Sequence, residues 1–166
     1  MLALTLTGFT FTPGELAEIV AVYRTNPVYF RAAGDYDPDH ILASEVEADL
    51  RDEVGTAGSE VLIARDESGE AVGVLCLLDR HPTDGHPWIG LLLVHGARHR
   101  QGLGRRLAAL VEERYRAAGR EGLRLAVLEN NPSALAFWSA LGWQEIDRRA
   151  DIAHARPSIV MHKALG

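Results

Sequence analysis

Cysteine is almost absent from this 166-residue sequence, and the one that occurs, Cys76, lies in an apolar run at residues 72–78. A single thiol excludes an internal disulfide framework and a cluster of thiolate metal ligands. We therefore expect no metal site and a cytoplasmic location. Because Cys76 lies in the middle of a predicted strand, we interpret it as a core residue rather than a nucleophile.

Long apolar runs are also lacking. No uninterrupted stretch approaches the roughly 18 residues that a membrane-spanning helix needs. The amino terminus has no basic segment followed by an apolar one, which a secretion signal would require. The sequence thus predicts neither a membrane partner nor export.

A positive net charge is missing as well, because 23 acidic residues outnumber 17 basic ones and give a formal net charge of -6. Phosphate backbones attract basic surfaces, so nucleic acid is not an expected partner. The local group of arginines between Arg98 and Arg106 could still bind a small polyanion.

The remaining composition is that of an ordinary globular protein, with 47% hydrophobic and 24% charged residues. A chain of this length is large enough to bury a full core and fits one domain better than two. We expect one domain over residues 1–166.

The first part of the chain contains one strand pattern and two helix patterns. Alternating leucines at positions 2, 4 and 6 predict a half-buried edge strand. Thr12 and Glu15 have capping-box spacing and predict a helix with an apolar face at positions 16, 19, 20 and 23. A second helix is expected after Pro38, with Leu42, Val46 and Leu50 on one face, and should end near Gly55.

The later part alternates short apolar runs with two more helices. We expect strands near residues 61–64, 72–78, 88–94, 123–128, 143–147 and 158–163. A helix follows Gly104, with its core face formed by Leu103, Leu107, Leu110, Val111 and Tyr115. A short helix lined by Ala134, Phe137, Trp138 and Leu141 ends at Gly142. The order is β-α-α-β-β-β-α-β-α-β-β, a mixed α/β fold of six to seven strands and about four helices.

Residues 94–104 read Val-His-Gly-Ala-Arg-His-Arg-Gln-Gly-Leu-Gly and lead from a strand directly into a helix. Glycines allow a ligand to approach the backbone closely, and the free N–H groups of a helix's first turn bind anions. Arg100, Arg105 and Arg106 could add charge-assisted hydrogen bonds. By itself such a turn is also compatible with a plain connection, and it matches neither the P-loop nor the dinucleotide-binding pattern.

A second segment makes the pattern specific. Residues 129–143 read Glu-Asn-Asn-Pro-Ser-Ala-Leu-Ala-Phe-Trp-Ser-Ala-Leu-Gly-Trp: an Asn after a strand, a short helix with paired aromatics, and Leu-Gly-aromatic. This segment resembles the second signature of the GNAT acetyltransferases, and the turn at residues 94–104 resembles their first. The resemblance covers about residues 61–165. It implies a mostly antiparallel sheet, acetyl-coenzyme A (acetyl-CoA) as acyl donor, and N-acetylation of an amine.

The resemblance also implies a binding site for acetyl-CoA. The amides from Gln101 to Arg105 would hold the pyrophosphate, and the strand at Leu92–Val94 would pair with the pantetheine arm. Asn131 would hold that arm against the following helix, or cap that helix, and both roles are compatible. The full set implied is Leu92, Leu93, Val94, Arg98, His99, Arg100, Gln101, Gly102, Leu103, Gly104, Arg105, Asn131, Ala134 and Trp138.

Two positions depart from the family pattern. His99 occupies the first position of the family's Arg/Gln-x-x-Gly-x-Gly/Ala signature, although arginines flank it. Trp138 aligns with the Tyr that often protonates the departing thiolate in this family. An indole N–H is not an acid at useful pH, so we assign no general acid and interpret Trp138 as core packing.

An amine acceptor needs a base, because most of it is protonated at neutral pH. The candidates are Glu129, Asp79, His81 and His95, which all follow predicted strands. We rank Glu129 first because it lies nearest the expected cleft. For each of them the alternative is a solvated loop residue.

The acceptor site is expected between residues 26–36 and 148–156, with Tyr29, Phe30, Tyr36 and His81 as candidate contacts, although aromatics beside a helix are also typical of a core. The leading hypothesis is an acyltransferase that acts on a small-molecule or protein amine without a covalent intermediate. A module that binds acyl-CoA without turnover and a purely structural subunit are the alternatives. Strand edges near the carboxyl terminus could pair two copies in a homodimer.

Overall fold

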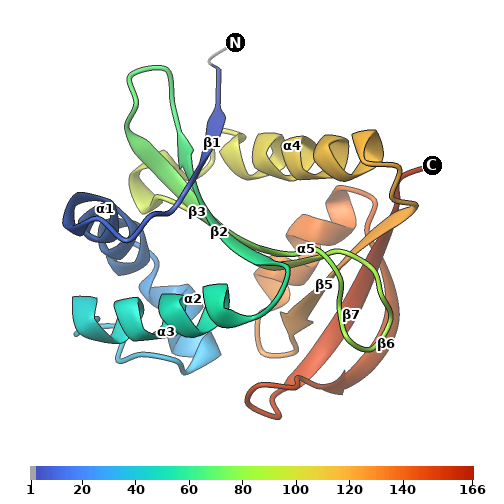
Figure 1. The fold of residues 1–166 in the computed structure, drawn as a ribbon. Helices are drawn as coiled ribbons and strands as arrows, with labels where there is room; N and C mark the ends of the chain where they lie inside the picture. The colour runs from blue at the N-terminus through green and yellow to red at the C-terminus, as the bar shows by residue number, and fades with distance from the viewer. Residues whose placement is uncertain (1–2) are drawn as a thin grey trace.

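The computed structural model describes residues 3–166 (Figure 1), and its elements are built around one seven-stranded sheet with strand order β1-β2-β3-β4-β5-β7-β6. The elements are β1 (Thr5–Gly8), α1 (Pro13–Arg24), α2 (Pro27–Ala33), α3 (Ala43–Gly55), β2 (Ser59–Arg65), β3 (Ala71–Leu78), β4 (Trp88–Val94), the 3-10 turn η1 (Gly96–Arg98), α4 (Leu103–Ala117), β5 (Gly122–Leu128), α5 (Pro132–Ala140), β6 (Gln144–Ala150) and β7 (Pro157–Ala164).

Neighbouring strands run antiparallel except for β4 and β5, which are parallel and are joined through α4. A parallel pair needs a crossover connection, and α4 supplies it. The predicted mixed α/β fold with a mostly antiparallel sheet is confirmed. The structure has five α-helices where about four were expected.

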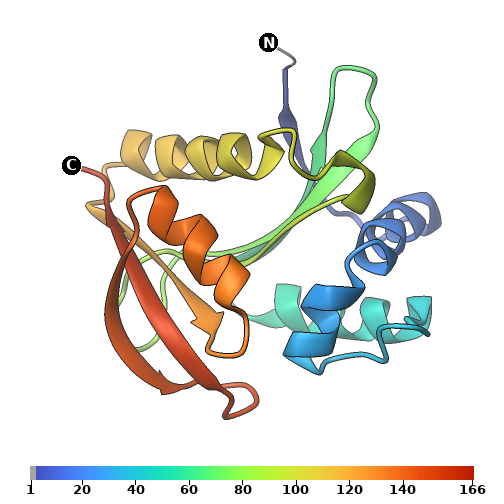
Figure 2. The same ribbon diagram turned by 180° about the vertical axis from the view of Figure 1, so that it is seen from behind.

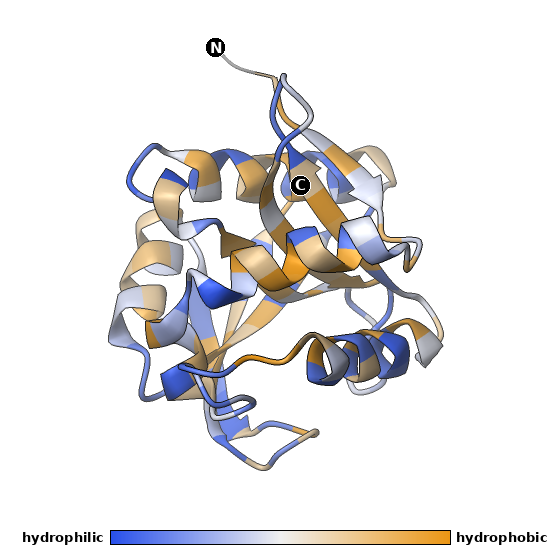
Figure 3. Ribbon diagram, turned by 90° about the vertical axis from the view of Figure 1, so that its left-hand side faces the viewer, coloured by the Kyte–Doolittle hydropathy of each residue, from blue (hydrophilic) through white to orange (hydrophobic). Residues whose placement is uncertain are grey.

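Helices cover both faces of the sheet. In Figure 1, α1, α2 and α3 gather on one side, and Figure 2 shows α4 and α5 on the other. Alternate residues of the central strands point to opposite faces, so two apolar clusters form. Ile63 and Val74 face α1–α3, whereas Leu62 and Leu75 face α4 and α5. In Figure 3 the central strands are largely hydrophobic in colour, whereas hydrophobic and hydrophilic residues alternate along the helices.

The start of α1 follows the sequence prediction. The Glu15 amide donates to the Thr12 hydroxyl at 3.2 Å, and the Glu15 carboxylate accepts from the Thr12 amide at 3.4 Å. Pro13 occupies the first turn, where its missing N–H costs nothing. Of the predicted apolar face, Ile19, Val20 and Tyr23 are buried and Leu16 is half-buried.

Several element boundaries differ from the prediction. The aromatic segment after α1 contains the additional helix α2, which starts at Pro27. Helix α3 begins only at Ala43, and Leu42 is its exposed N-cap rather than part of its buried face. Leu110 of α4 is 38% exposed, because it lies at the margin of that helix's apolar stripe. Leu2 lies outside the described residues.

Candidate functional site

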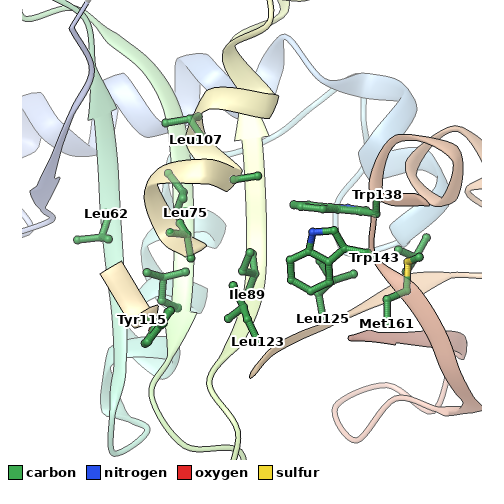
Figure 4. Close-up of a cluster of buried hydrophobic side chains, with 14 of the residues drawn as sticks. Leu62, Leu75, Ile89, Leu107, Tyr115, Leu123, Leu125, Trp138, Trp143 and Met161 are labelled. Atoms are coloured by element: carbon green, nitrogen blue, oxygen red, sulfur yellow. The ribbon is translucent and has the colours of Figure 1, made fainter. Parts of the chain in front are cut away.

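The parallel strands β4 and β5 pair at only two positions, Trp88 with Arg124 and Ile89 with Leu125. Beyond these pairs β5 continues beside β7 to Leu128, while β4 continues beside β3 to Val94. Figure 4 shows the two strands diverging above Ile89. The edge of β4 that faces β5 therefore has free backbone groups, which suit an extended ligand.

A β-bulge lies where the strands part. Cys76 is paired with Leu91 and Leu77 with Ile89, so Gly90 has no partner on β3. Gly90 is exposed, whereas Trp88 and Ile89 before it are buried. The strand expected near residues 88–94 is present, but the apolar run is not buried throughout, because β5 no longer covers its second half.

The predicted pantetheine-binding residues occupy this second half of β4. Leu92 and Val94 are half-buried and pack with the cluster beneath α4 and α5, whereas Leu93 is buried against α1–α3. The Leu93 side chain therefore lies on the sheet face opposite α4 and α5.

The turn from β4 to α4 is held by its own side chains. His99 places Nε2 2.8 Å from the Val94 carbonyl, and Arg98 forms an ion pair of 3.2 Å with Asp66 in the β2–β3 turn. Arg98 also donates through Nε to the Gln101 side chain at 3.3 Å. These contacts anchor the loop, and Arg100 remains exposed.

Helix α4 starts from a left-handed residue, since its N-cap Gly102 has φ 77°. The first backbone hydrogen bond of the helix runs from the Arg106 amide to the Gly102 carbonyl at 3.1 Å. The preceding amides, including those of Leu103 and Arg105, are the donors that a helix leaves without internal partners. Helix dipole and amides together favour an anion here, which fits the pyrophosphate expected at this turn.

Gly104 is where α4 meets α5. A Cβ atom at this position would lie 3.1 Å from the Phe137 ring. The backbone of the first turn is therefore packed against an aromatic ring at this position. A large side chain at position 104 would have to displace the Phe137 ring or turn aside from it.

Asn131 caps α5. Its Oδ1 accepts hydrogen bonds from the Ala134 amide at 3.2 Å and from the Ser133 hydroxyl at 3.0 Å. The capping role that the sequence offered is confirmed, while a contact with the pantetheine arm stays a prediction. Ala134, whose amide donates to the cap, is half-buried against the core.

Trp138 and Trp143 flank the site on the α5 side. Their ring centroids are 5.2 Å apart at 67°, and both rings are buried. Within residues 3–166 the Trp143 N–H has no nitrogen or oxygen partner, and Figure 4 shows its nitrogen edge turned toward the Trp138 ring. An N–H contact with the π face accounts for this arrangement. Trp138 in turn points toward β4.

The predicted bases lie at different places around the sheet. Glu129, after β5, is 3.7 Å from Arg148 of β6. Asp79 forms an ion pair with Arg120 at 2.9 Å. His95 caps η1, because its Nδ1 accepts from the Ala97 amide at 3.1 Å. Each of these three groups thus already has a partner.

The predicted acceptor contacts divide into two groups. Phe30 is buried in the core cluster of α1–α3, where Tyr36 lies against it and donates a hydrogen bond to Asp49. Burial raises the pKa of Tyr29 to about 12. His81 lies apart from these, stacked on Trp88 with ring centroids 4.2 Å apart.

The two segments expected to build the acceptor site do meet. Arg156, before β7, donates to the Ala33 carbonyl at 2.7 Å and to Asp35 at 3.1 Å. Asn130 donates to the Ala32 carbonyl at 3.0 Å. The C-terminal end of α2 is thereby joined to the β6–β7 connection.

One residue beside the bulge was missed by the sequence reasoning. Glu53, in the last turn of α3, places Oε1 4.0 Å from the Cβ position of Gly90 and accepts a hydrogen bond from the Ser59 hydroxyl at 2.7 Å. Its sequence neighbourhood, Arg51-Asp52-Glu53, looks like an ordinary solvated helix end. Only the packing of α3 across β2 and β3 brings it to β4.

Residues 3–166 contain no arrangement typical of a metal site or of a membrane span. No group of three or more His, Cys, Asp or Glu side chains is arranged to hold a metal ion. No helix in this range is long and apolar enough to cross a membrane.

Sequence comparison gives the family. The profile described as the acetyltransferase (GNAT) family matches residues 19–143. The chain therefore belongs to the acetyltransferase (GNAT) family and is an enzyme of the acetyl-transfer class. A search of curated protein sequences finds no match.

Solved structures share the fold. An acetyltransferase from Thermus thermophilus has a TM-score of 0.77 at 24% identity, over 98% of this chain and 97% of that one. Spermidine N-acetyltransferase from Vibrio cholerae, solved with CoA and spermine, has a TM-score of 0.72 at 14% identity, over 98% and 95%. A GCN5-related N-acetyltransferase from Kribbella flavida has a TM-score of 0.66 at 20% identity, over 98% of both chains.

Proposed function

We propose that this acetyltransferase moves the acetyl group of acetyl-CoA to an amine by direct attack of the amine on the bound thioester. The observation that carries the proposal is the separation of β4 from β5 after two pairs, beside the open first turn of α4. The free strand edge suits an extended arm, and the helix terminus suits its phosphates. The Vibrio cholerae neighbour, named for spermidine, supports an amine as acceptor.

Direct attack is supported by the state of the only thiol. Cys76 is buried, and burial is the main reason that the pKa of its thiol is raised. A nucleophilic cysteine needs the opposite, a lowered pKa and partial exposure. Acyl transfer through a covalent cysteine intermediate is therefore not part of the proposal.

The residues implied by the family resemblance are proposed to hold acetyl-CoA. The amides of Gln101 to Arg105 would bind the pyrophosphate, and the backbone of Leu92–Val94 would pair with the pantetheine arm. Acetyl-CoA supplies an activated thioester, whose sulfur is a comparatively good leaving group. Trp138 would form a wall beside that sulfur without supplying a proton.

The test begins with melting temperatures in the presence of acetyl-CoA, CoA and ATP. Ligand at 100 times its Kd stabilises a protein by about 2.7 kcal/mol, which corresponds to a rise of roughly 5–10 °C for a chain of this size. We expect this rise with both CoA compounds and not with ATP. Gly104→Trp should abolish it, while Ala109→Trp, at an exposed position on the same helix, should not.

Turnover assays distinguish a transferase from a protein that only binds acyl-CoA. Thiol release that depends on an added amine, measured with polyamines, arylamines and lysine peptides, would establish the transferase. Saturable binding without amine-dependent release would favour an acyl-CoA sensing module, which the tryptophan at position 138 makes worth testing. No rise in melting temperature with either CoA compound would contradict the proposal and favour a structural role.

A further inference from the structure

The middle of β4 has a point at which the sheet is open. Gly90 has no Cα partner on β3, because the bulge passes over it, and none on β5, because parallel pairing ends at Ile89. It is exposed although it lies in a central strand. A substrate that reaches the edge of β4 at this point can be approached from the α3 side of the sheet.

A carboxylate lies on this side of the sheet, next to Gly90. Glu53 Oε1 lies 4.0 Å from the Cβ position of Gly90, on the side where Cys76 also lies. The Ser59 hydroxyl donates to this carboxylate at 2.7 Å, which fixes its direction. The Glu53 charge is near enough to Cys76 to contribute, after burial, to the raised pKa of that thiol.

We propose that Glu53 is the catalytic base of the acetyl transfer and takes a proton from the acceptor amine at the β4 bulge. The inference rests on the proposed function and names a residue for it. Other candidate carboxylates have cationic partners, Glu129 with Arg148 and Asp79 with Arg120. Glu53 has a hydroxyl partner instead, so its charge is available to an ammonium group.

The ammonium gives one proton to the Glu53 carboxylate, which passes it to water. The neutral nitrogen forms the C–N bond, and the C–S bond breaks with its electron pair on sulfur. The second nitrogen proton then moves to the thiolate, so that the products are the amide, the thiol of CoA and one proton in solution.

The groups packed against Glu53 determine how kcat/KM should depend on pH. Ser59 of β2, Cys76 of β3 and Gly90 of β4 face it, and among these three the thiol alone titrates, with a raised pKa. In a plot of kcat/KM against pH, the falling limb at low pH should thus arise from protonation of Glu53. Above that limb the wild-type value should be flat until the amine itself loses its proton.

Glu53→Gln tests the proposal with the best amine found for the wild type. General bases contribute about 100- to 10,000-fold, so kcat/KM at pH 7 should fall by at least about 100-fold. The variant should depend on amine that is already neutral, and its kcat/KM should rise about tenfold per pH unit between pH 7 and 9. The rise in melting temperature with acetyl-CoA should be retained.

Three more variants sharpen the result. Ser59→Ala removes the hydrogen bond that fixes the direction of the carboxylate and should lower kcat/KM, by less than Glu53→Gln does. Asp52→Asn, the exposed neighbour on α3, should leave the profile unchanged. Glu129→Gln tests the base that the sequence favoured.

The outcomes are distinct. A wild-type pH profile in Glu53→Gln, with amine acetylation intact, would overturn this inference and leave the proposed function standing. A lost limb in Glu129→Gln instead would also overturn it. If the wild type acetylates no amine at all, the proposed function fails and takes this inference with it.

Discussion

At the scale of single residues, Asn26 joins the end of α1 to the C-terminal end of β4. Its side chain is buried and donates to the Val22 carbonyl at 2.9 Å and to the Val94 carbonyl at 3.0 Å. Next to it, the Thr25 hydroxyl accepts from the Gly96 amide at 2.8 Å. The turn that should hold phosphates is thus fastened to α1 by two consecutive polar residues.

We expect Asn26→Ala to lower the free energy of unfolding by about 2 kcal/mol, because two hydrogen bonds of a buried side chain are lost. Urea denaturation measures this loss. Asn130→Ala is the matched control, since Asn130 is exposed and donates a single bond to the Ala32 carbonyl. Equal effects of the two substitutions would contradict the role assigned to Asn26.

Single residues also differ in how far their roles could be predicted from the sequence. Asn131 and Gly102 were predictable, because a cap and a left-handed turn are local and depend on a few neighbouring residues. Glu53 was not, because its role depends on Gly90, to which only tertiary packing brings it. A local pattern carries no information on such a pair.

At the scale of elements, a polar cluster joins the β3–β4 loop to β5 and β7. Arg124 donates to His162 Nδ1 at 3.2 Å and pairs with Asp84 at 3.2 Å, while the Trp88 indole donates to Asp84 at 3.1 Å. Burial lowers the pKa of His162, and the nearby Arg124 lowers it further; burial also lowers the pKa of His81. Both imidazoles are neutral in this arrangement.

This cluster predicts how stability changes with pH. A histidine with a lowered pKa in the folded state binds its proton more readily when unfolded. The free energy of unfolding should therefore fall as pH drops below the ordinary histidine pKa of about 6.5. His162→Gln should reduce the slope between pH 7 and 5, whereas His40→Gln, at an exposed position, should not. Urea denaturation at each pH would show the difference, and identical slopes for all three proteins would contradict it.

Some elements were predictable from the sequence, and others were not. The strand at residues 122–128 was predictable, because a short apolar run lies there between turn residues, with Gly119 before it and Asn130 after it. The sequence did not reveal that β4 and β5 diverge. The divergence depends on how two strands pair that are separated in the chain by α4. The helix α2 was missed because its seven residues are too few to show a helical period.

At the scale of the whole molecule, the two apolar clusters lie on opposite faces of one sheet and share β2, β3 and β4. The three tryptophans, Trp88, Trp138 and Trp143, all lie within or after β4, and α1–α3 contain none. Tryptophan fluorescence thus reports the β4–β7 half, while far-UV circular dichroism reports all helices. The two probes can reveal whether the α1–α3 layer unfolds separately.

We expect one transition, with the same urea midpoint by both probes, because removing α1–α3 would expose one face of strands that also carry the other cluster. Val46→Ala, at a fully buried position on α3, should lower the free energy of unfolding by about 2 kcal/mol. Both midpoints should then fall together. Saturating acetyl-CoA should raise both together if it binds at β4 and α4 as proposed, since β4 carries the α1–α3 layer. A Val46→Ala variant whose dichroism midpoint falls while its fluorescence midpoint stays would mean that the layer is a separate unit, and that the base proposed on α3 is held by less than the whole fold.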